Sequence, residues 1–401
     1  MRVLEQMNDI IEKEREALVS ISKRIFDNPE LGLQERFAST IMCEYLEQNG
    51  FSVTRGAGGL DTAYVAQLER GTGGFHVAFC AEYDALPEIG HACGHNLIGM
   101  ASVTAGIALG KTLLGEDIPF KVSVIGTPDE EGTGGKIDLI NAGVFRDVDI
   151  CMMFHPGYET IIHVESLAFH SYEFIFHGKP AHAASEPWEG KNALDGVIQT
   201  FNAVNALRQH VKPDVRIHGI IKEGGLATNI VPERAVAEFC IRSEDNTTLE
   251  EVVERVLNCA RGAAVSTGTD LEIKPIGHFY DAMNSNRALG EVFEESLAET
   301  KYSDPTRFQE GKGSIDMGNV SNVVPAIHPV LSLTEQMVPG HTPEFAAMCN
   351  TEHAYEVMLL AGKAMALTAY KVIQSPVLQK RIKQEFEESR STKQSQSGER
   401  A

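Results

Sequence analysis

A thiol and an imidazole stand two residues apart in the segment 90–96, Gly-His-Ala-Cys-Gly-His-Asn. As a thiolate and a neutral imidazole, Cys93 and His95 can bind one transition-metal ion. For either residue alone, a buried thiol or a structural histidine would be the ordinary interpretation. Acidic and histidine clusters later in the chain reverse that preference, so the leading hypothesis is metal chemistry.

Three further segments supply the other groups that such a site needs. Glu130 and Glu131 follow an apolar run, His155 ends another, and His341 lies in the turn 339–343, Pro-Gly-His-Thr-Pro. Adjacent glutamates are usually surface charge, but directly after a buried strand one can bind metal while the other moves a proton. Thiolate, imidazole and carboxylate together suit zinc or manganese and match calcium or magnesium poorly. A carboxylate that deprotonates water and then protonates a leaving amine performs amide hydrolysis.

The composition limits the kind of partner. At 401 residues with 43% hydrophobic content, the chain is longer than one core usually serves, so we expect two domains. A formal net charge of -21 argues against nucleic acid and anionic membrane surfaces and favours a small-molecule substrate. The seven cysteines, several of them in apolar runs, fit a reduced cytoplasmic setting. We find no export signal and no apolar run near the about 20 residues that span a membrane, so we expect a soluble protein.

The candidate residues follow the strands of a predicted α/β sheet. The expected elements are two helices within 10–49, a helix at 97–114, and strands at 76–80, 121–126 and 149–154. Such sheets place their sites where strands end and loops begin. The first strand is followed by Glu82, Asp84 and Cys93, the second by the glutamate pair, and the third by His155.

From about residue 165 the pattern changes to that of a smaller unit. Its order of strand, helix, strand, strand, helix and strand is typical of a split β-α-β unit. The elements are expected at 171–176, 192–209, 215–222, 235–242, 248–264 and 271–275. We therefore predict a discontinuous catalytic domain, 1–166 and 284–384, with a domain inserted at 167–283. The polar segment 385–401 has almost no apolar residues, and we expect a disordered tail there.

Seven motifs, in order, resemble those of the M20 family of dinuclear metallopeptidases and aminoacylases, especially its amidohydrolase branch. They are Asp-Ala-Leu-Pro at 84–87, His-Ala-Cys-Gly-His at 91–95, Glu-Glu-Gly at 130–132, His-Pro at 155–156, Gly-Lys-Pro-Ala-His-Ala at 178–183, Thr-Asn-Ile-Val-Pro at 228–232 and Gly-His-Thr at 340–342. The resemblance extends over nearly the whole chain.

The resemblance implies a zinc-peptidase-like catalytic domain with an inserted α+β, ferredoxin-like lid and dimerisation domain. It also implies two divalent metal ions per subunit, zinc or manganese, in a homodimer. The implied ligands are Cys93, His95, Glu131, His155 and His341, with Cys93 as the candidate bridge. Glu130 would be the general base, and Asp84 would support the site from outside the ligand shell.

In the inserted domain the resemblance assigns three residues to the substrate. His182 would stabilise the developing oxyanion, with reach across the dimer, although a histidine in a plain surface turn is the alternative. Asn229 and Arg242 would hold the substrate, because a guanidinium binds a carboxylate through two hydrogen bonds. A surface charge at a strand end is the alternative for Arg242.

Two departures from the family pattern narrow the substrate class. Asn96 follows His95 where many members of the branch have Asp, and the segment 313–316 is Gly-Ser-Ile-Asp where Gly-Ser-Glu-Asp is commoner. Together with Ala-Glu-Tyr-Asp at 81–84, these features resemble the subgroup of aminobenzoyl-glutamate hydrolases and β-alanyl dipeptidases. The implied substrate has an amide bond next to an amino-acid carboxylate.

The sequence therefore predicts a cytoplasmic, homodimeric two-metal enzyme that cleaves an N-acyl amino acid, an aminobenzoyl-glutamate-like compound or a dipeptide. The alternative from another class is a non-catalytic metal-binding or regulatory protein that kept the fold. A nearer alternative is an exopeptidase that requires a free amino group, and an acidic pocket residue facing an ammonium would distinguish it.

Overall fold

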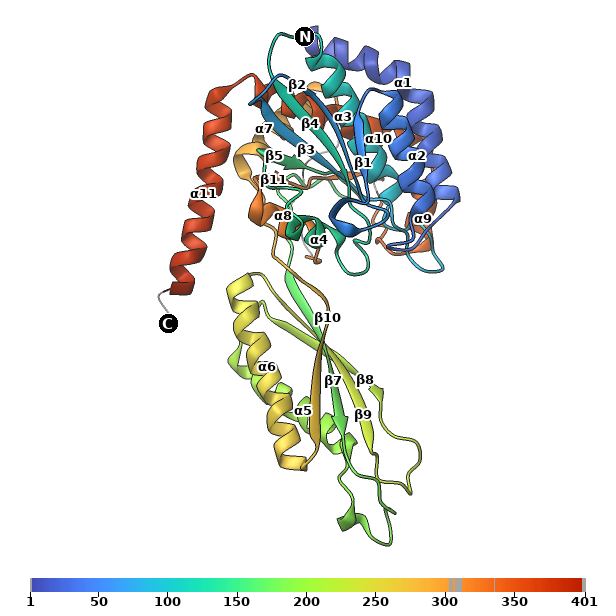
Figure 1. The fold of residues 1–401 in the computed structure, drawn as a ribbon, viewed down its shortest axis with the longest axis vertical. Helices are drawn as coiled ribbons and strands as arrows, with labels where there is room; N and C mark the ends of the chain where they lie inside the picture. The colour runs from blue at the N-terminus through green and yellow to red at the C-terminus, as the bar shows by residue number, and fades with distance from the viewer. Residues whose placement is uncertain (1, 303–305, 307–311, 335, 399–401) are drawn as a thin grey trace. The chain divides into compact units, whose positions relative to one another are not determined.

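The computed structural model describes residues 2–302, 306, 312–334 and 336–398. The chain forms two compact units (Figure 1). Unit 1 comprises Met1–Glu165, Met283–Lys312 and Asp316–Ala401, and unit 2 comprises Ser166–Ala282 and Gly313–Ile315. The inserted domain expected at 167–283 differs from unit 2 by one residue at each end. The short return of the chain at Gly313–Ile315 was not predicted.

A six-stranded sheet runs through unit 1. Its order is β1 (Ser52–Arg55), β2 (Tyr64–Arg70), β4 (Phe120–Gly126), β3 (Phe75–Ala81), β5 (Ile150–Met152) and β11 (Ala326–Ile327). Strands β4, β3, β5 and β11 are parallel to one another, while β1 and β2 are antiparallel additions at one edge. A second pair of parallel strands joins β6 (His155–Gly157) to β12 (Val330–Ser332). The parallel component of the predicted sheet is confirmed, and its carboxyl ends share one edge.

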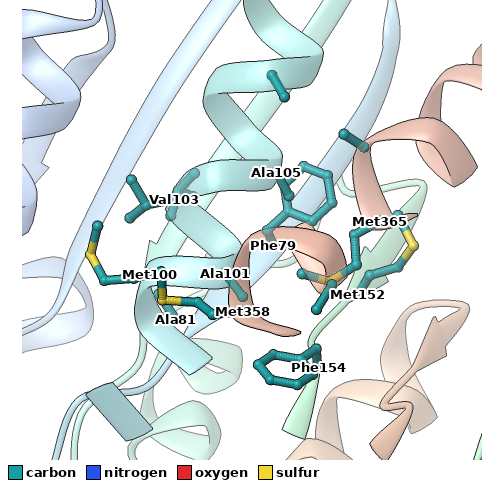
Figure 2. Packing of buried hydrophobic residues seen from close by; sticks show 14 of the residues in the cluster. Phe79, Ala81, Met100, Ala101, Val103, Ala105, Met152, Phe154, Met358 and Met365 are labelled. Carbon is teal, nitrogen blue, oxygen red and sulfur yellow. The ribbon is translucent and has the colours of Figure 1, made fainter. Parts of the chain in front are cut away.

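Several helices complete unit 1. They are α1 (Arg2–Asp27), α2 (Arg36–Gln48), η1 (Ala57–Gly59), α3 (His95–Leu113), α4 (Gly135–Asn141), α7 (Arg287–Glu299), α8 (Met317–Val323), α9 (Pro343–Met348), α10 (Glu352–Ile373) and α11 (Pro376–Gly398). Helix α3 is buried along almost its whole length, which explains why it is apolar on every side. Figure 2 shows Met100 and Val103 of α3 in the core with Phe79 of β3 and Met358 of α10. This packing fixes the amino end of α3 against the sheet edge.

Unit 2 is the expected split β-α-β arrangement. Its elements are β7 (Ala168–His177), η2 (Pro187–Glu189), α5 (Ala193–Leu207), η3 (Arg208–His210), β8 (Arg216–Glu223), β9 (Arg234–Ser243), α6 (Asn246–Thr267) and β10 (Asp270–Tyr280). The sheet is antiparallel with the order β10-β7-β9-β8, and apolar side chains of α5 and α6 complete one core with it. The α/β fold class with an inserted α+β domain is confirmed.

The predicted disordered tail at 385–401 is wrong for its described part, because α11 continues to Gly398. Ile382 and Phe386 lie one helical turn apart and are both buried. The carboxylate of Glu385 accepts hydrogen bonds from the backbone N–H groups of Arg287 and Ala288, which begin α7. One apolar pair and one cap thus anchor a helix that looks too polar to be ordered. Residues 399–401 lie outside the described residues.

Candidate metal centre

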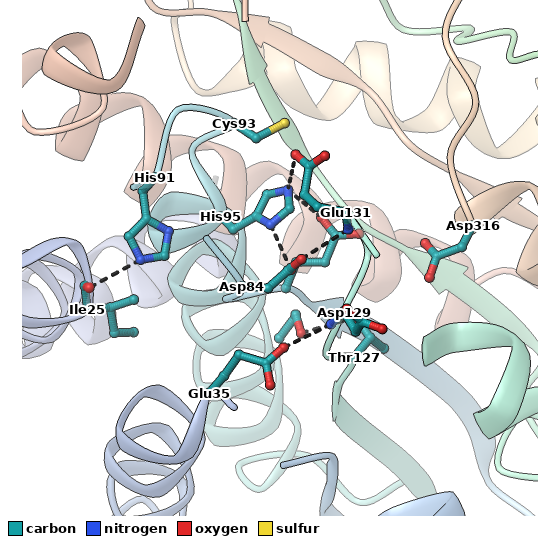
Figure 3. Close-up of polar contacts among 12 residues, drawn as sticks. Ile25, Glu35, Asp84, His91, Cys93, His95, Thr127, Asp129, Glu131 and Asp316 are labelled. Carbon is teal, nitrogen blue, oxygen red and sulfur yellow. Dashed lines mark hydrogen bonds and ion pairs between the residues drawn. The ribbon is translucent and has the colours of Figure 1, made fainter. Parts of the chain in front are cut away.

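The site lies at the carboxyl edge of the parallel strands. Asp84 comes from the loop after β3, Glu131 from the loop after β4, and His155 from β6, soon after β5. Helix α3 begins with His95, and Cys93 lies two residues before it. In Figure 3 the side chains of Cys93, His95, Glu131 and Asp84 converge from these segments. Segments that are far apart in sequence thus deliver their side chains to one place.

The structure brings all five predicted ligands into two groups that share one residue. In each group the three donor atoms lie within 4.8 Å of one another, and the groups are Cys93, His95 and His155, and Cys93, Glu131 and His341. A third such group consists of His95, Glu130 and Glu131. Cys93 therefore stands where a bridging ligand would be needed.

Hydrogen bonds set which nitrogen of each imidazole is free. Nδ1 of His95 lies 2.8 Å from Oδ1 of Asp84, so it carries the proton and donates. Nε2 of His95 is buried and has no hydrogen-bond partner in the described part of the chain. Nδ1 of His155 lies 2.7 Å from the carbonyl oxygen of Pro156, which leaves Nε2 facing Sγ of Cys93 at 3.3 Å. Both rings therefore direct Nε2, the nitrogen that would bind a metal, into the same region, as metal-binding histidines do.

The charges also fit cations. The carboxylates near the site are those of Glu82, Asp84, Glu130, Glu131 and Asp316. Burial, followed by the nearby carboxylates of Glu82 and Asp316, raises the pKa of Glu130 well above its usual value. Burial likewise raises the pKa of the Cys93 thiol. Ionising these groups out of water therefore requires positive charge nearby, and this donor set of sulfur, nitrogen and oxygen matches two divalent transition-metal ions.

Asp84 is buried and joins two ligand candidates. One oxygen accepts from the His95 ring, and the other accepts from the backbone N–H of Glu131 at 3.0 Å. Burial by itself would raise the pKa of Asp84, but the charge and the hydrogen bond of His95 outweigh it and hold that pKa below its usual value. Asp84 therefore fixes the ring orientation of one ligand and the backbone of another.

Sequence reasoning did not assign several residues that the structure places at the site. Glu82 and Asp316 form ion pairs with the buried Lys136 at 2.5 and 2.6 Å, and Oε2 of Glu82 lies 3.5 Å from Nε2 of His95. The ring centroid of the buried His328 lies 5.6 Å from that of His155. Glu82, like Asp316 in its Gly-Ser-x-Asp segment, stood in a motif that could have signalled a role. Lys136 and His328 carried no such signal.

Two residues of the segment 90–96 serve the scaffold instead. Nε2 of His91 lies 3.2 Å from the carbonyl oxygen of Ile25, and its ring points away from Cys93 (Figure 3). The amide of Asn96 donates to Oγ of Ser22 at 3.1 Å and to the carbonyl oxygen of Cys349 at 3.3 Å. An aspartate could not donate these bonds when ionised, which explains the amide at this position.

Unit 2 carries the three predicted substrate-facing residues. Nδ1 of the exposed His182 accepts hydrogen bonds from the backbone N–H groups of Ala184 and Ser185, both at 3.2 Å. The ring proton is therefore on Nε2, the outward nitrogen. The N–H of Ala183 donates to the carbonyl oxygen of Asn229 at 3.0 Å, so the segments of His182 and Asn229 lie side by side.

Arg242 lies on β9 of unit 2. Its guanidinium donates to Oγ of Ser314 at 3.1 Å and lies 5.2 Å from the ring centroid of Phe169. The return segment Gly313–Ile315 thus supports this side chain. Stacking on the Phe169 ring and the hydrogen bond to Ser314 together restrain the guanidinium, which favours a fixed orientation over that of a free surface charge.

The chain is similar to known proteins over most of its length. A family model described as a peptidase dimerisation domain matches residues 164–267. The Xaa-Arg dipeptidase of Homo sapiens is 35% identical over 395 residues, which cover 94% of this chain and 90% of that protein. One of the p-aminobenzoyl-glutamate hydrolase subunits of Escherichia coli (strain K12) is 28% identical over 455 residues, covering 95% and 94% of the two chains.

Solved structures share the fold. An aminobenzoyl-glutamate utilization protein from Klebsiella pneumoniae has a TM-score of 0.73 at 20% identity, covering 91% of this chain and 98% of that one. A dinuclear metal-binding peptidase of the M20 family from Bacillus subtilis has a TM-score of 0.69 at 18% identity, covering 91% and 99%. The chain belongs to the M20 family of metallopeptidases and amidohydrolases. None of the helices in its described part combines the length and apolar character that crossing a bilayer requires.

Proposed function

We propose that this protein is a two-metal amidohydrolase that cleaves the amide bond of a dipeptide or an N-acyl amino acid. The observation that carries the proposal is the pair of three-donor groups that share Cys93, with Glu130 beside them. The names of its relatives, a dipeptidase and an aminobenzoyl-glutamate hydrolase, agree with this reaction class.

In this proposal Cys93, His95 and His155 hold one ion, and Cys93, Glu131 and His341 hold the other. When bound, the two ions act as Lewis acids that polarise the scissile carbonyl and make water acidic enough to attack near neutral pH. The position of His341 supports its part, since Nε2 lies 3.2 Å from Oε1 of Glu131. The preference for zinc or manganese remains a prediction from the donor types.

Glu130 is the proposed general base. Its carboxylate takes a proton from the attacking water and passes that proton to the leaving amine. The adjacent position of Glu131 ties the base to the metal centre, because a shift of this loop moves both side chains together.

His182, Asn229 and Arg242 are proposed to act on the substrate. The outward Nε2–H of His182 suits donation to the negative oxygen that develops on the carbonyl. Arg242 suits the carboxylate of the product amino acid. Unit 2 matches a dimerisation domain, so we propose a homodimer in which unit 2 serves as dimerisation and lid domain. Cytoplasmic location remains a prediction from cysteine usage.

The decisive experiment is a hydrolysis panel with zinc- and manganese-loaded protein. The panel contains dipeptides that end in arginine, N-acetyl amino acids, p-aminobenzoyl-glutamate and β-alanyl dipeptides. Glu130→Gln is the matched blank, because it keeps the size of the side chain and removes the base. We expect turnover of one class, lowered at least about 100-fold in the variant while metal binding persists. Full turnover by metal-loaded Glu130→Gln would overturn the base assignment.

A second arm separates the amidohydrolase from an exopeptidase. Each dipeptide that is cleaved is compared with its N-acetylated form. Equal turnover supports a site that tolerates an acyl group, whereas loss of turnover on acetylation indicates recognition of a free ammonium. Either result names the substrate class within the proposed reaction.

A further inference from the structure

The loop that carries Glu130 and Glu131 contains a strained residue directly before them. Asp129 has a φ of 62°, in the left-handed region that residues other than glycine rarely adopt. Its side chain accepts from the backbone N–H of Thr133 at 2.9 Å, and its carbonyl oxygen accepts from the N–H of Gly134 at 2.9 Å. Strain of this kind persists only where the surroundings hold it in place.

Two buried carboxylates hold this loop from either side of Glu130. Oε1 of Glu35 accepts from the backbone N–H of Asp129 at 2.9 Å, and Oδ2 of Asp84 accepts from the N–H of Glu131 at 3.0 Å. Figure 3 shows both contacts as dashed lines. The residues immediately before and after Glu130 are thus each fixed by a side chain from another segment.

Glu35 is itself held rigidly. It is fully buried, and its second oxygen, Oε2, accepts from Oγ1 of Thr62 at 2.8 Å. The turn before Glu35 also packs closely against the loop of Asp129, because a Cβ added at Gly32 would lie 1.7 Å from Oδ1 of Asp129. The turn after α1, which the sequence identified only as a break between helices, therefore forms one wall around Asp129.

We propose that Glu35 is a positioning residue that holds Asp129 in its left-handed conformation and thereby fixes the side chains of Glu130 and Glu131. The roles of these two glutamates rest on the proposed function. Without the Glu35 acceptor, the buried N–H of Asp129 loses its partner. Relaxation of Asp129 to an ordinary φ then relieves the strain and no longer costs that hydrogen bond. That rotation displaces the following two residues, and small displacements at a reacting centre are costly.

The test compares Glu35→Leu with Glu35→Gln. Leucine keeps much of the volume and removes both acceptors. Glutamine keeps an oxygen for the N–H of Asp129 and turns its amide nitrogen to the hydroxyl of Thr62, which can accept. Because burial raises the pKa of Glu35 to about 7, a neutral side chain is tolerated there.

Two readouts are measured. In metal-loaded enzyme, Glu35→Leu is expected to lower kcat about 10- to 100-fold with KM changed less than about threefold, and Glu35→Gln to restore most of kcat. In metal-free protein, amide hydrogen exchange of residues 127–134 is expected to become faster in Glu35→Leu and to stay near wild type in Glu35→Gln. The exchange readout needs neither substrate nor metal.

Glu30→Leu is the matched control. The side chain of Glu30 accepts from the N–H groups of Phe37 and Ala38 at 2.9 and 3.0 Å. Its loss therefore weakens the start of α2, the helix that follows Glu35, without removing a contact to Asp129. We expect wild-type kcat and wild-type exchange at 127–134 in this control. Should Glu35→Leu fail to fold, Thr62→Val, which removes only the bond to Oε2 of Glu35, replaces it and should accelerate exchange in the same segment.

Wild-type exchange at 127–134 in the variant used would overturn the proposal, as would equal losses of kcat in Glu35→Leu and Glu30→Leu. If the wild-type protein turns over no substrate in the panel, the proposed function fails while the exchange comparison still decides the role of Glu35. The two failures are therefore distinguishable.

Discussion

A buried lysine beside the candidate metal centre gives a prediction about the free energy of unfolding. Lys136 is fully buried, and its Nζ lies 2.5 Å from Oε1 of Glu82 and 2.6 Å from Oδ1 of Asp316, which are buried as well. Lys136→Met keeps the length of the side chain but leaves two carboxylates without their cation. Breaking a buried ion pair in this way costs about 3–5 kcal/mol, because an uncompensated charge stays out of water.

The assay is urea denaturation of metal-free protein, followed by fluorescence and circular dichroism. Lys111→Met is the control, since Nζ of Lys111 lies 2.8 Å from Oε1 of Glu14 but its side chain is 31% exposed. That pair should contribute at most about 1 kcal/mol. A triple variant, Lys136→Met with Glu82→Gln and Asp316→Asn, removes all three charges and should regain more than half of the loss.

The charge argument has two ways to fail. It fails if Lys136→Met lowers the free energy of unfolding no more than Lys111→Met does, because water or a structural change then compensates the two carboxylates. It also fails if the triple variant is as unstable as Lys136→Met alone, because the loss of stability then comes from packing of the lysine stem and not from its charge.

Three further outcomes are expected. Burial lowers the pKa of His76 below 6.5, so the unfolded chain binds a proton more readily than the folded one and stability falls as the pH drops below about 6.5. In His76→Asn, the dependence of the free energy of unfolding on pH in this acid range, measured by urea titration, should flatten by up to about 1.4 kcal/mol per pH unit. An unchanged slope would contradict this. Asp84→Asn should lower metal affinity about 10- to 100-fold in calorimetric titration, and wild-type affinity would refute its orienting role. Ile382→Ala should cost about 2–5 kcal/mol of local stability and speed proteolysis of α11. Proteolysis at the wild-type rate would show that this contact does not anchor the helix.

The sequence by itself determined the family, the order of elements and the candidate donor residues that the structure brings together. Apolar runs with strand or helix periodicity are local signals, so β3 (Phe75–Ala81) and α3 (His95–Leu113) lie close to their expected places. Because parallel strands end at a common edge, it also followed that Cys93, Glu131 and His155 would come together. The spacing of the motifs carried this information without any knowledge of the packing.

The tertiary structure decided which charged residues are buried and what they hold. Lys136 and Asp316 are 180 residues apart in sequence, and Glu35 meets Asp129 across 94 residues. In sequence, Lys136 and Glu35 are indistinguishable from solvated surface charges. The same holds for α11, where Ile382 and Phe386 order a polar helix by packing. Burial is a property of the assembled core, and the free energy of a charge or an apolar side chain depends on that environment rather than on its neighbours in the chain.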